Sequence, residues 1–416
     1  MITKDVIVLG AGMVGIGTAA HLVSRGASVA LVDRGAPAGE TSFGNAGLIQ
    51  AEAVVPYTFP HSARVIFGVL AGTRNDARVD LTALPSHARR WFAFFRNGTP
   101  SAIRRTTDAM VPLIKAALPE HKSLAEHAGV SHLLRPGGYL RIFRDPADLD
   151  GASAEAEKVA QEFDIPTERL SAAELAEAEP HLTTDLVGAI HYLEPHSVPD
   201  PADLGEAYAA HVTAAGGTLL QGDARTLTRT GERWTVTTAE GPFSAKDVVI
   251  ALGPWSADLL AAHGIKVPLF VKRGYHTHRQ AAGNAVLNHL VVDEGNGIVL
   301  APQRRGIRIT TGAEFTHRDA PSGSAQLSAA MPVAEGLFPL DNTPATPPWR
   351  GARPCLPDLL PMIGPVDGAP GLWANFGHQH LGFTLGPATG RLLAEAMTGG
   401  TPFTSLSPYA VNRFAR

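Results

Sequence analysis

The sequence predicts an α/β protein in which a Rossmann-like dinucleotide-binding domain is interwoven with a second, α+β domain. Two observations lead to this fold class. A strand–turn–helix–strand unit occupies residues 5–33, and β/α patterns of the same kind return near 201–255 and 372–397. Short alternating runs from about 267 to 312 are typical of an antiparallel sheet. We therefore expect a nucleotide domain assembled from separate pieces of the chain, with a second domain built from the segments between them.

The N-terminal unit has the residues that a dinucleotide site requires. A strand-like run leads directly into GAGMVG at 10–15, a G-x-G-x-x-G turn, and a helix and a second strand follow. Gly10 permits the tight turn, Gly12 lets the backbone approach a pyrophosphate, and Gly15 lets the helix pack closely on the strand. Asp33 ends the second strand, 18 residues after Gly15, where its carboxylate can accept hydrogen bonds from a ribose.

The composition is that of a globular protein with a large core. The chain has 416 residues, of which 44% are hydrophobic and 18% are charged, and this length favours two domains. The net charge of −4 argues against a nucleic-acid-binding protein, which would normally present a basic face. Cys355 is the only cysteine, so an intrachain disulfide is impossible and a reducing compartment is favoured.

These features indicate a cytoplasmic location, with membrane contact that is at most peripheral, at the inner face of the membrane. Asp5 interrupts the apolar N-terminal run, and cleavage of that run as a signal peptide would destroy the nucleotide motif. No stretch of about 18 apolar residues is present. The most apolar stretches elsewhere are 65–71 and 91–95, and two interpretations stay open for them: internal packing, or a peripheral patch that contacts a membrane surface.

The segments between the nucleotide pieces predict both helices and strands. Helical patterns dominate from about 86 to 130, and a strand is expected at 139–143. Helices are expected at 152–163 and 171–179, and Ser171 with Glu174 would form a capping box at the start of the second. The proline-rich segment 343–349 is expected to be a crossing linker, followed by a strand at 372–375 and a helix at 386–397. We predict a nucleotide domain of residues 1–54, 196–256 and 350–416, and a second domain of residues 55–195 and 257–349.

Three further segments are rich in glycine and carry hydroxyl or basic side chains. They are GETSFGNAGL at 39–48, GARP at 351–354 with PD and IG soon after it, and NFGHQHLGF at 375–383. Together with the N-terminal motif and GDAR at 222–225, they resemble the FAD-dependent D-amino acid oxidase superfamily, and within it the D-amino acid dehydrogenase-like branch. The resemblance implies a glutathione-reductase-type FAD-binding domain and an α+β substrate domain built on an antiparallel sheet.

The resemblance also implies which residues contact FAD. In the family, the segment matching 39–48 lines the pyrophosphate and the flavin ring, and the segment matching 375–383 lies at the pyrimidine edge of the flavin. Cys355 lies near the position at which the sarcosine oxidase branch tethers its flavin, but the spacing to Pro357 is shorter, so non-covalent FAD is expected. The implied cofactor-binding residues are Gly10, Gly12, Met13, Val14, Gly15, Asp33, Arg34, Thr41, Ser42, Asn45, Ala46, Gly47, Leu48, Ala224, Arg225, Gly253, Trp255, Arg353, Gly377, His378, His380, Leu381 and Gly382.

A smaller set of residues is implied to act on the substrate. Arg353 would clamp the substrate carboxylate, because its planar guanidinium offers two parallel hydrogen bonds. Tyr275, in the KRGYH strand at 272–276 that borders the substrate cavity in the family, would bind the carboxylate or cap the pocket. The implied catalytic residues are Arg353, Tyr275, His276, His378 and His380, the histidines being candidates if a side chain transfers a proton. No metal is expected, because the two H-x-H pairs lack a third ligand.

The activity that the resemblance implies is that of an FAD-dependent D-amino acid dehydrogenase. It would deaminate a small amino acid, of D configuration or a cyclic imino acid such as a D-proline derivative, by hydride transfer from Cα to flavin N5. Electrons would then pass to an acceptor other than nicotinamide, such as a quinone or a carrier protein. A glycine- or sarcosine-type oxidase that uses oxygen is the alternative. An NAD-dependent dehydrogenase would explain only the first motif, and a nucleotide-sensing protein would not explain Arg353.

Overall fold

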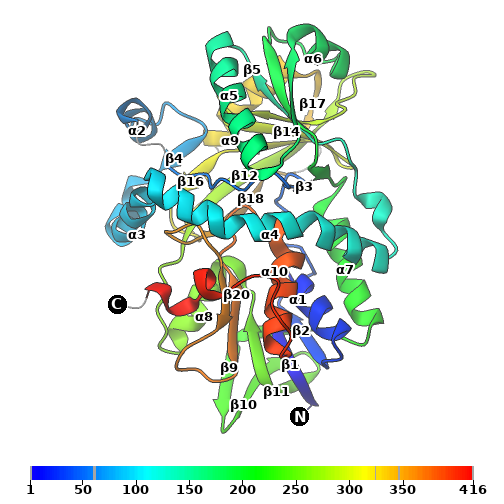
Figure 1. The fold of residues 1–416 in the computed structure, drawn as a ribbon, viewed down its shortest axis with the longest axis vertical. Helices are drawn as coiled ribbons and strands as arrows, with labels where there is room; N and C mark the ends of the chain where they lie inside the picture. The colour runs from blue at the N-terminus through cyan, green and yellow to red at the C-terminus, as the bar shows by residue number, and fades with distance from the viewer. Residues whose placement is uncertain (1, 60–61, 324, 345–346, 415–416) are drawn as a thin grey trace.

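The computed structural model describes residues 2–59, 62–323, 325–344 and 347–414. Figure 1 shows two sheets at opposite ends of an elongated molecule, with helix α4 (Pro100–His127) crossing between them. One sheet is mostly parallel and draws its strands from both ends of the chain and from residues 218–250, and the other is mostly antiparallel. The α/β class and the interwoven architecture that the sequence predicts are confirmed.

The mostly parallel sheet has the buried core of a nucleotide-binding fold. Its strands are β1 (Ile2–Leu9), β2 (Val29–Asp33), β9 (Thr218–Thr230), β10 (Arg233–Thr238), β11 (Gly241–Ile250), β19 (Met362–Pro365) and β20 (Leu372–Phe376). β1 lies between β2 and β11 and is parallel to both, while β10 and β19 are antiparallel to their neighbours. Alternate residues of β1 belong to two different hydrophobic cores, which explains why its last four residues are all apolar.

Helices cover both faces of this sheet. One face packs against α1 (Met13–Ser24), α7 (Pro201–Ala214) and α10 (Gly382–Met397), and the other packs against α8 (Ser256–Ala262) and the last turns of the chain. Close contact between α1 and α10 depends on Gly17 and Gly390, because a Cβ atom at either position would lie 2.4–2.6 Å from the backbone of the other helix. The N-terminal end of α10 therefore comes close to the glycine turn before α1.

The second sheet has eleven strands. Its main path runs β4 (Ala77–Val79), β16 (Ala313–Phe315), β12 (Phe270–Ala281), β15 (Gly306–Thr311), β14 (Ile298–Gln303), β13 (Leu290–Asp293), β5 (Tyr139–Phe143), β7 (Gly188–Tyr192) and β6 (Thr167–Ser171); β17 (Leu340–Pro344) and β18 (Trp349–Cys355) both pair with β12. A short pair, β3 (Leu48–Ile49) and β8 (His196–Ser197), lies apart from both sheets. The remaining helices are α2 (Ala63–Leu70), α3 (Leu84–Arg96), α5 (Pro146–Phe163), α6 (Ala172–Ala178) and α9 (Ala325–Leu337).

Most predicted elements are present, with shifted ends. The capping box before α6 is observed, since Ser171 and Glu174 each bind the other's backbone N–H. Helix α5 begins six residues earlier than expected, because Asp145 caps it and Pro146 occupies its first position. The expected linker is shorter than predicted: β17 ends at Pro344 and β18 begins at Trp349, while 345–346 lie outside the described residues.

Helix α10 begins at Gly382, four residues before the predicted start, and contains Pro387. Proline has no N–H, so the carbonyl of Phe383 has no helical partner. His121 of α4 supplies one, because its Nε2 lies 3.0 Å from that carbonyl oxygen. Burial lowers the pKa of His121 to about 4, so the ring is neutral and can carry its hydrogen on Nε2. An internal proline is thus tolerated through a long-range contact that the sequence pattern does not show.

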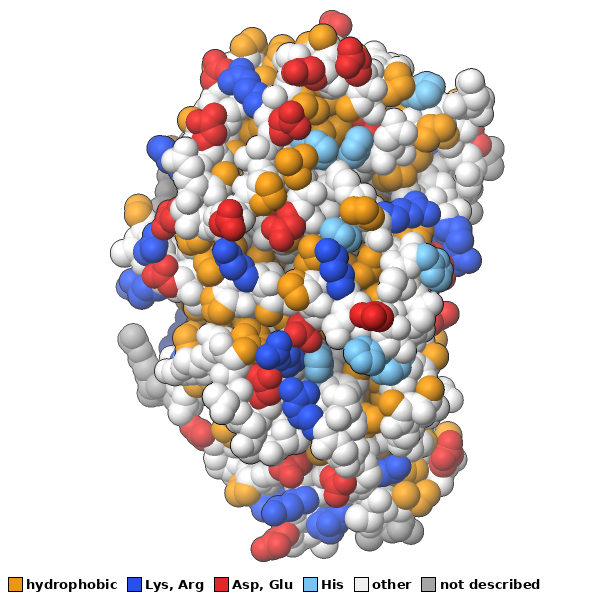
Figure 2. Space-filling model, turned by 45° about the vertical axis from the view of Figure 1, so that its right-hand side comes forward, with side chains coloured by type: hydrophobic (Ala, Val, Ile, Leu, Met, Phe, Trp, Pro, Cys, Tyr) orange, Lys and Arg blue, Asp and Glu red, His pale blue; other side chains and the backbone are white. Residues whose placement is uncertain are grey.

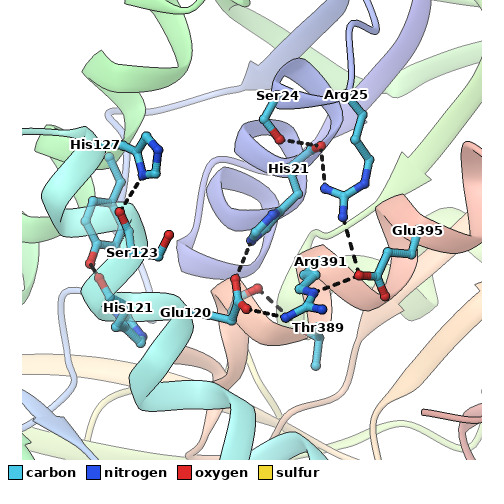
Figure 3. Close-up of polar contacts among 12 residues, drawn as sticks. His21, Ser24, Arg25, Glu120, His121, Ser123, His127, Thr389, Arg391 and Glu395 are labelled. Atoms are coloured by element: carbon cyan, nitrogen blue, oxygen red, sulfur yellow. Dashed lines mark hydrogen bonds and ion pairs between the residues drawn. The ribbon is translucent and has the colours of Figure 1, made fainter. Parts of the chain in front are cut away.

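A chain of charged groups ties α4 to α1 and α10. Figure 3 shows Glu120 of α4 between His21 of α1 and Arg391 of α10, with Arg391 also bound to Glu395. The Nη1 of Arg391 lies 2.7 Å from Glu120 Oε1, and its Nε lies 2.7 Å from Glu395 Oε1. Helix α4 lies in the segment that we assigned to the second domain, yet it packs on the helices of the nucleotide-binding sheet.

The domain boundaries given above remain a proposal. All seven strands of the parallel sheet fall within 1–54, 196–256 and 350–416, in keeping with that proposal. Strand β18, at the start of the third segment, joins the larger sheet instead. The chain thus passes between the two sheets at β18. This strand carries Arg353, the arginine that the resemblance implies for the substrate carboxylate.

Candidate active site

A cavity of about 1440 Å³ runs along the boundary between the two sheets. Its wall includes the glycine turn before α1 at one end and residues of β12 and β18 at the other. Segments that are more than 300 residues apart in the sequence therefore share one wall. The volume and length of the wall suit a large extended ligand better than a free amino acid alone.

At one end, the glycine turn is shaped by close backbone contacts. Gly10 has φ +106°, a conformation that strongly favours glycine, and a Cβ there would lie 2.4 Å from the carbonyl oxygen of Ala251. A Cβ on Gly15 would lie 1.7 Å from the carbonyl oxygen of Gly10. The turn thus brings the N-terminus of α1 to the cavity wall, where its free N–H groups and positive dipole end suit a phosphate.

Two side chains hold this turn in place. Asp33 accepts a hydrogen bond from the Ala11 N–H at 2.6 Å and another from the Gly35 N–H at 2.9 Å. Ser42 accepts one from the Met13 N–H at 3.0 Å, so its hydroxyl lies at the start of α1. Asp33 and Ser42 both line the cavity, and binding of a ribose by Asp33 stays a prediction.

Farther along this end, a cation stacks on an aromatic ring. The Arg34 guanidinium carbon lies 4.3 Å from the ring centroid of Trp255, and Arg34 also pairs with Glu40 at 3.0 Å. Arg225 pairs with its neighbour Asp223 at 2.8 Å. Arg34, Trp255 and Arg225 all line the cavity, and their contact with FAD stays a prediction.

The 39–48 segment crosses the middle of the cavity against β18. The Thr41 hydroxyl donates to the carbonyl of Ala352 at 3.1 Å. The Asn45 side chain accepts from the N–H groups of Gly47 and Leu48 and so fixes the bend. The Trp349 ring lies against Gly44, where a Cβ would be 2.0 Å from the ring. The absence of a side chain at Gly44 therefore leaves room for the Trp349 ring.

At the opposite end, two cations lie side by side in the cavity wall. Arg353 of β18 pairs in register with Lys272 of β12, and the Arg353 guanidinium crosses the face of Gly274. Arg353 donates to the carbonyl of Gly312 at 3.1 Å, and Lys272 Nζ lies 4.0 Å from the ring centroid of Phe94. Burial lowers the pKa of both groups. Among the described residues, no acidic side chain forms an ion pair with either cation.

Two unpaired cations in a partly buried wall have an electrostatic consequence. An unpaired charge out of water is unfavourable, and a ligand carboxylate that binds both groups removes that cost. Arginine can give such a carboxylate two parallel hydrogen bonds, and the lysine ammonium adds a point charge. The sequence singled out Arg353 for this task but assigned Lys272 only to the bordering strand. Because they stand opposite each other on β12 and β18, this end of the cavity is suited to an anion.

Tyr275 also lines the cavity, but its hydroxyl is already engaged. It donates to Glu314 Oε2 at 2.5 Å, and Arg273 binds the same carboxylate through two nitrogens. Burial, the hydrogen bond and the charge of Glu314 raise the pKa of Tyr275 to about 12. We therefore retain Tyr275 as a wall residue, and not as a donor to the substrate carboxylate.

The three predicted histidines differ in position. His378 and His380 line the cavity, and burial lowers the pKa of each to about 3, so both are neutral at pH 7. His378 bonds the Thr389 hydroxyl at 3.0 Å, whereas His380 Nε2 is buried with no hydrogen-bond partner among the described residues. His276 does not line the cavity: its ring stacks on Trp349, 4.8 Å between centroids. We no longer propose His276 as a catalytic residue.

The cavity wall contains most of the residues that the sequence singled out. Those on the wall are Gly10, Gly12, Met13, Val14, Asp33, Arg34, Thr41, Ser42, Asn45, Ala46, Leu48, Ala224, Arg225, Gly253, Trp255, Tyr275, Arg353, Gly377, His378, His380 and Gly382. Gly15, Gly47, His276 and Leu381 lie outside it. Gly15 and Gly47 instead support the neighbouring backbone, because a Cβ on either would clash with a carbonyl oxygen.

Sequence reasoning missed several residues of the substrate end. Tyr57 lines the cavity and its ring contacts His380 at 5.5 Å between centroids. Glu52 is buried behind the wall, and its carboxylate accepts hydrogen bonds from Gln50 at 3.0 Å and from Tyr139 at 3.3 Å. Burial raises the pKa of Glu52 to about 6. An acidic residue in the apolar run after residue 48 was the available signal. Over the part of the chain that the structure describes, no group of three His, Cys, Asp or Glu is placed to hold a metal.

The arrangement fits FAD. A helix N-terminus beside Gly12 can hold a pyrophosphate, the Arg34–Trp255 end can hold an adenine and ribose, and the start of α10 can face a flavin edge that gains negative charge on reduction. Cys355 lines the cavity with its thiol buried, and burial raises the pKa of that thiol, which disfavours the thiolate that a covalent tether would need.

Comparison with known proteins agrees with this geometry. The family model described as FAD dependent oxidoreductase matches residues 5–396. A D-amino-acid oxidase of Bradyrhizobium diazoefficiens is 27% identical over 99% of each chain, and a D-amino acid dehydrogenase of the same organism is 29% identical, also over 99% of each. The crystal structure of glycine oxidase from Geobacillus kaustophilus superposes with a TM-score of 0.74 at 23% identity over the whole of both chains. The chain therefore belongs to the FAD-dependent oxidoreductase family of D-amino acid oxidase type, and FAD is its cofactor.

Proposed function

We propose that this protein is an FAD-dependent dehydrogenase that oxidises the Cα–N bond of a small amino acid. The observation that supports it is the pair Arg353 and Lys272, two cations in the cavity wall with no acidic partner among the described residues. Their natural counterpart is the carboxylate of an amino acid. The similarity to a D-amino acid dehydrogenase and a D-amino-acid oxidase favours a substrate of D configuration, or a cyclic imino acid such as a D-proline derivative.

The chain contributes binding and orientation. Arg353 and Lys272 would hold the carboxylate, and the aromatic rings of Phe94, Phe315 and Tyr57 would exclude water from the rest of the substrate. FAD, when bound, supplies the hydride acceptor. The proposed FAD-binding residues are those on the cavity wall, and we propose that they bind it without a covalent bond.

The amine must be uncharged when the Cα–H bond breaks, because an ammonium has no lone pair to stabilise the developing positive charge. The neutral rings of His378 and His380 place no positive charge beside it, since their pKa values lie near 3. His380 Nε2, which has no partner among the described residues, can hydrogen-bond the amine. We propose these two histidines as positioning groups for the substrate nitrogen.

The electron acceptor is proposed to be something other than oxygen or nicotinamide, such as a quinone or a carrier protein. The similarity to a D-amino acid dehydrogenase favours this, whereas the similarity to a D-amino-acid oxidase keeps a glycine- or sarcosine-type oxidase as the second candidate. Rates with an artificial dye under argon and with an oxygen electrode separate the two. Among the described residues, no helix is both long and apolar enough to cross a membrane. We propose a cytoplasmic location with peripheral contact at the inner face of the membrane.

The visible spectrum of the purified protein tests the proposal. We expect flavin absorbance near 450 nm that bleaches on anaerobic addition of at least one member of a panel of D-, L- and N-methyl amino acids and cyclic imino acids. Bleaching by D-amino acids or D-proline derivatives supports the proposed substrate class. Bleaching only by glycine or sarcosine supports the second candidate. A holoprotein that no member of the panel reduces contradicts both.

A further inference from the structure

Residues 62–99 expose an unusual amount of apolar side chain. Nine large hydrophobic residues of the described chain are exposed, and five of them lie in this segment: Phe67, Leu70, Leu81, Leu84 and Phe92. Phe67 is 74% exposed and Phe92 is 62% exposed. Single exposed apolar residues are ordinary, but a group of them on neighbouring elements marks an interaction surface.

These side chains lie on the outer side of two amphipathic helices. On α3 and the turn before it, the exposed residues Leu81, Leu84, Ala88 and Phe92 recur every three or four positions, while His87 and Phe94 are buried on the opposite side. On α2, Phe67 and Leu70 are exposed and Val69 is buried. Figure 1 shows α2 and α3 projecting on the same side of the molecule. We call this surface, formed by α2, α3 and the turn 81–83, the α2–α3 face.

The charge of this segment is opposite to that of the chain. Residues 62–99 contain six arginines and two aspartates with no lysine or glutamate, a net charge of +4 in a protein of net charge −4. The two aspartates are engaged: Asp76 binds Arg74 of the same segment, and Asp80 caps the turn 81–83. Arg64, Arg89 and Arg96 are exposed, and no acidic side chain of the described residues pairs with them.

We propose that the α2–α3 face docks on an anionic lipid bilayer. Exposed Phe and Leu side chains can enter the boundary between headgroups and acyl chains, while the arginines bind lipid phosphates. A second copy of this chain fits less well, because a two-fold contact would bring the unpaired arginines of both copies together. On the face that Figure 2 brings forward, by contrast, apolar, acidic and basic side chains are intermixed.

The α2–α3 face is also next to the cavity. Residues 62–99 also supply Asp76, Ala77 and Phe94 to the cavity wall. A protein docked through this face would hold its substrate end close to the bilayer, where a lipid-soluble acceptor is concentrated. The delivery of electrons to a lipid-soluble acceptor rests on the proposed function, whereas the binding of vesicles does not.

Co-sedimentation of the holoprotein with vesicles tests the proposal. We compare vesicles of phosphatidylcholine alone with vesicles that contain 40% phosphatidylglycerol. We expect binding to the anionic vesicles at least ten-fold stronger than to the neutral ones, and weakened in 0.5 M salt. The double variants Phe67→Ser/Phe92→Ser and Arg89→Glu/Arg96→Glu should each bind at least ten-fold more weakly.

Matched controls use exposed residues elsewhere on the chain. Leu193→Ser/Val286→Ser removes two exposed apolar side chains, and Arg169→Glu/Arg304→Glu reverses two exposed charges. We expect both controls to bind as the unaltered protein does. Without vesicles, all variants should keep their flavin and their activity with a water-soluble dye. This measurement distinguishes a failure of the proposed catalytic function from a failure of the proposed membrane binding.

Three results would overturn the proposal. The first is a wild-type protein that does not bind anionic vesicles. The second is a control pair that loses binding as much as the α2–α3 pair does. The third is a dimer, measured by light scattering, that the Phe67→Ser/Phe92→Ser variant abolishes while vesicle binding is absent; this would assign the face to a second copy instead.

Discussion

Beside the glycine turn, where the nucleotide phosphates are proposed to bind, the cavity wall is mostly backbone and small residues, whereas at the substrate end it is charged and aromatic side chains. The nucleotide end depends on Gly10 and Gly15, whose backbone contacts leave no room for a side chain. The substrate end depends on Arg353, Lys272 and Tyr57, which come from three distant segments.

This difference separates two kinds of recognition. A phosphate can be bound by N–H groups that every helix N-terminus has, so the local sequence only needs to keep the approach open. A particular amino acid needs fixed charges at fixed places, and side chains can supply these only after the strands that carry them have paired. The predictions below test each end separately, from the largest expected effect to the smallest.

Loss of the cofactor is expected from Gly15→Val. Because a Cβ at this position would lie 1.7 Å from the Gly10 carbonyl oxygen, the turn and α1 must move apart. We expect at least a 100-fold loss of FAD affinity, measured as the ratio of absorbance at 450 and 280 nm and by titration with FAD. Gly151→Ala in α5, where a Cβ would meet no atom within 4 Å, is the matched control. Normal flavin content in Gly15→Val would show that the turn is not the phosphate site.

At the substrate end, Arg353→Met should leave FAD bound but impair reduction by substrate. Removing one partner of a charge-assisted pair typically costs about 3–4 kcal/mol, which corresponds to a roughly 10²- to 10³-fold fall in kcat/KM. Stopped-flow reduction under argon measures the effect, and Arg353→Lys should recover part of it because it keeps the charge. If Arg353→Met binds and reduces substrate normally, the carboxylate is held elsewhere.

Glu52→Gln should make the folded protein more stable at alkaline pH. Burial raises the pKa of Glu52 to about 6 from 4.5, so the folded state holds this proton more tightly than the unfolded state. The resulting stabilisation is complete below pH 4.5 and is lost as the pH rises through 6. Above that pH the carboxylate costs about 2 kcal/mol relative to a neutral side chain.

Chemical denaturation at pH 5 and pH 8 measures this effect. The difference in unfolding free energy between Glu52→Gln and wild type should be larger at pH 8 than at pH 5. Glu168→Gln, an exposed residue of β6, should show no such difference. Equal differences at the two pH values would mean that Glu52 ionises normally.

The smallest effect on stability is expected from Arg391→Met, on the side of α10 that contacts α4. This side chain joins Glu120 and Glu395 but is 38% exposed, so water screens its ion pairs. We expect a loss of about 0.5–1 kcal/mol in unfolding free energy, with unchanged FAD affinity. Arg104→Met, which removes two more exposed ion pairs, one within α4 and one between α4 and α5, should cost less. A large loss of FAD from Arg391→Met would show that the α4–α10 contact shapes the cavity directly.

The sequence predictions were accurate for features that depend on neighbouring residues and inaccurate for those that depend on distant segments. The GAGMVG turn, the capping box of α6 and strand β5 could be predicted because each depends on neighbouring residues. The start of α10 was placed four residues too late, because the partner of the Phe383 carbonyl is His121, 262 residues away. His276 was a candidate because it belongs to an H-x-H pair on the strand that borders the cavity. It shares a face of β12 with Lys272 and Gly274, but the ring of Trp349, from the neighbouring strand β18, stacks on it and takes its place in the cavity wall.

The sequence by itself determined the βαβ unit and the position of the glycine turn, because these follow from local geometry. Arg353 was singled out for a carboxylate through the resemblance to the family, and the chemistry of its guanidinium suits that role. The tertiary structure decided that Lys272 stands beside Arg353, that Tyr57 meets His380 and that α4 supports α10. Such contacts depend on strand register and helix packing between segments up to about 300 residues apart. The register and the packing are fixed only in the folded chain, because each strand or helix pair buries its side chains fully only when the neighbouring elements are in place.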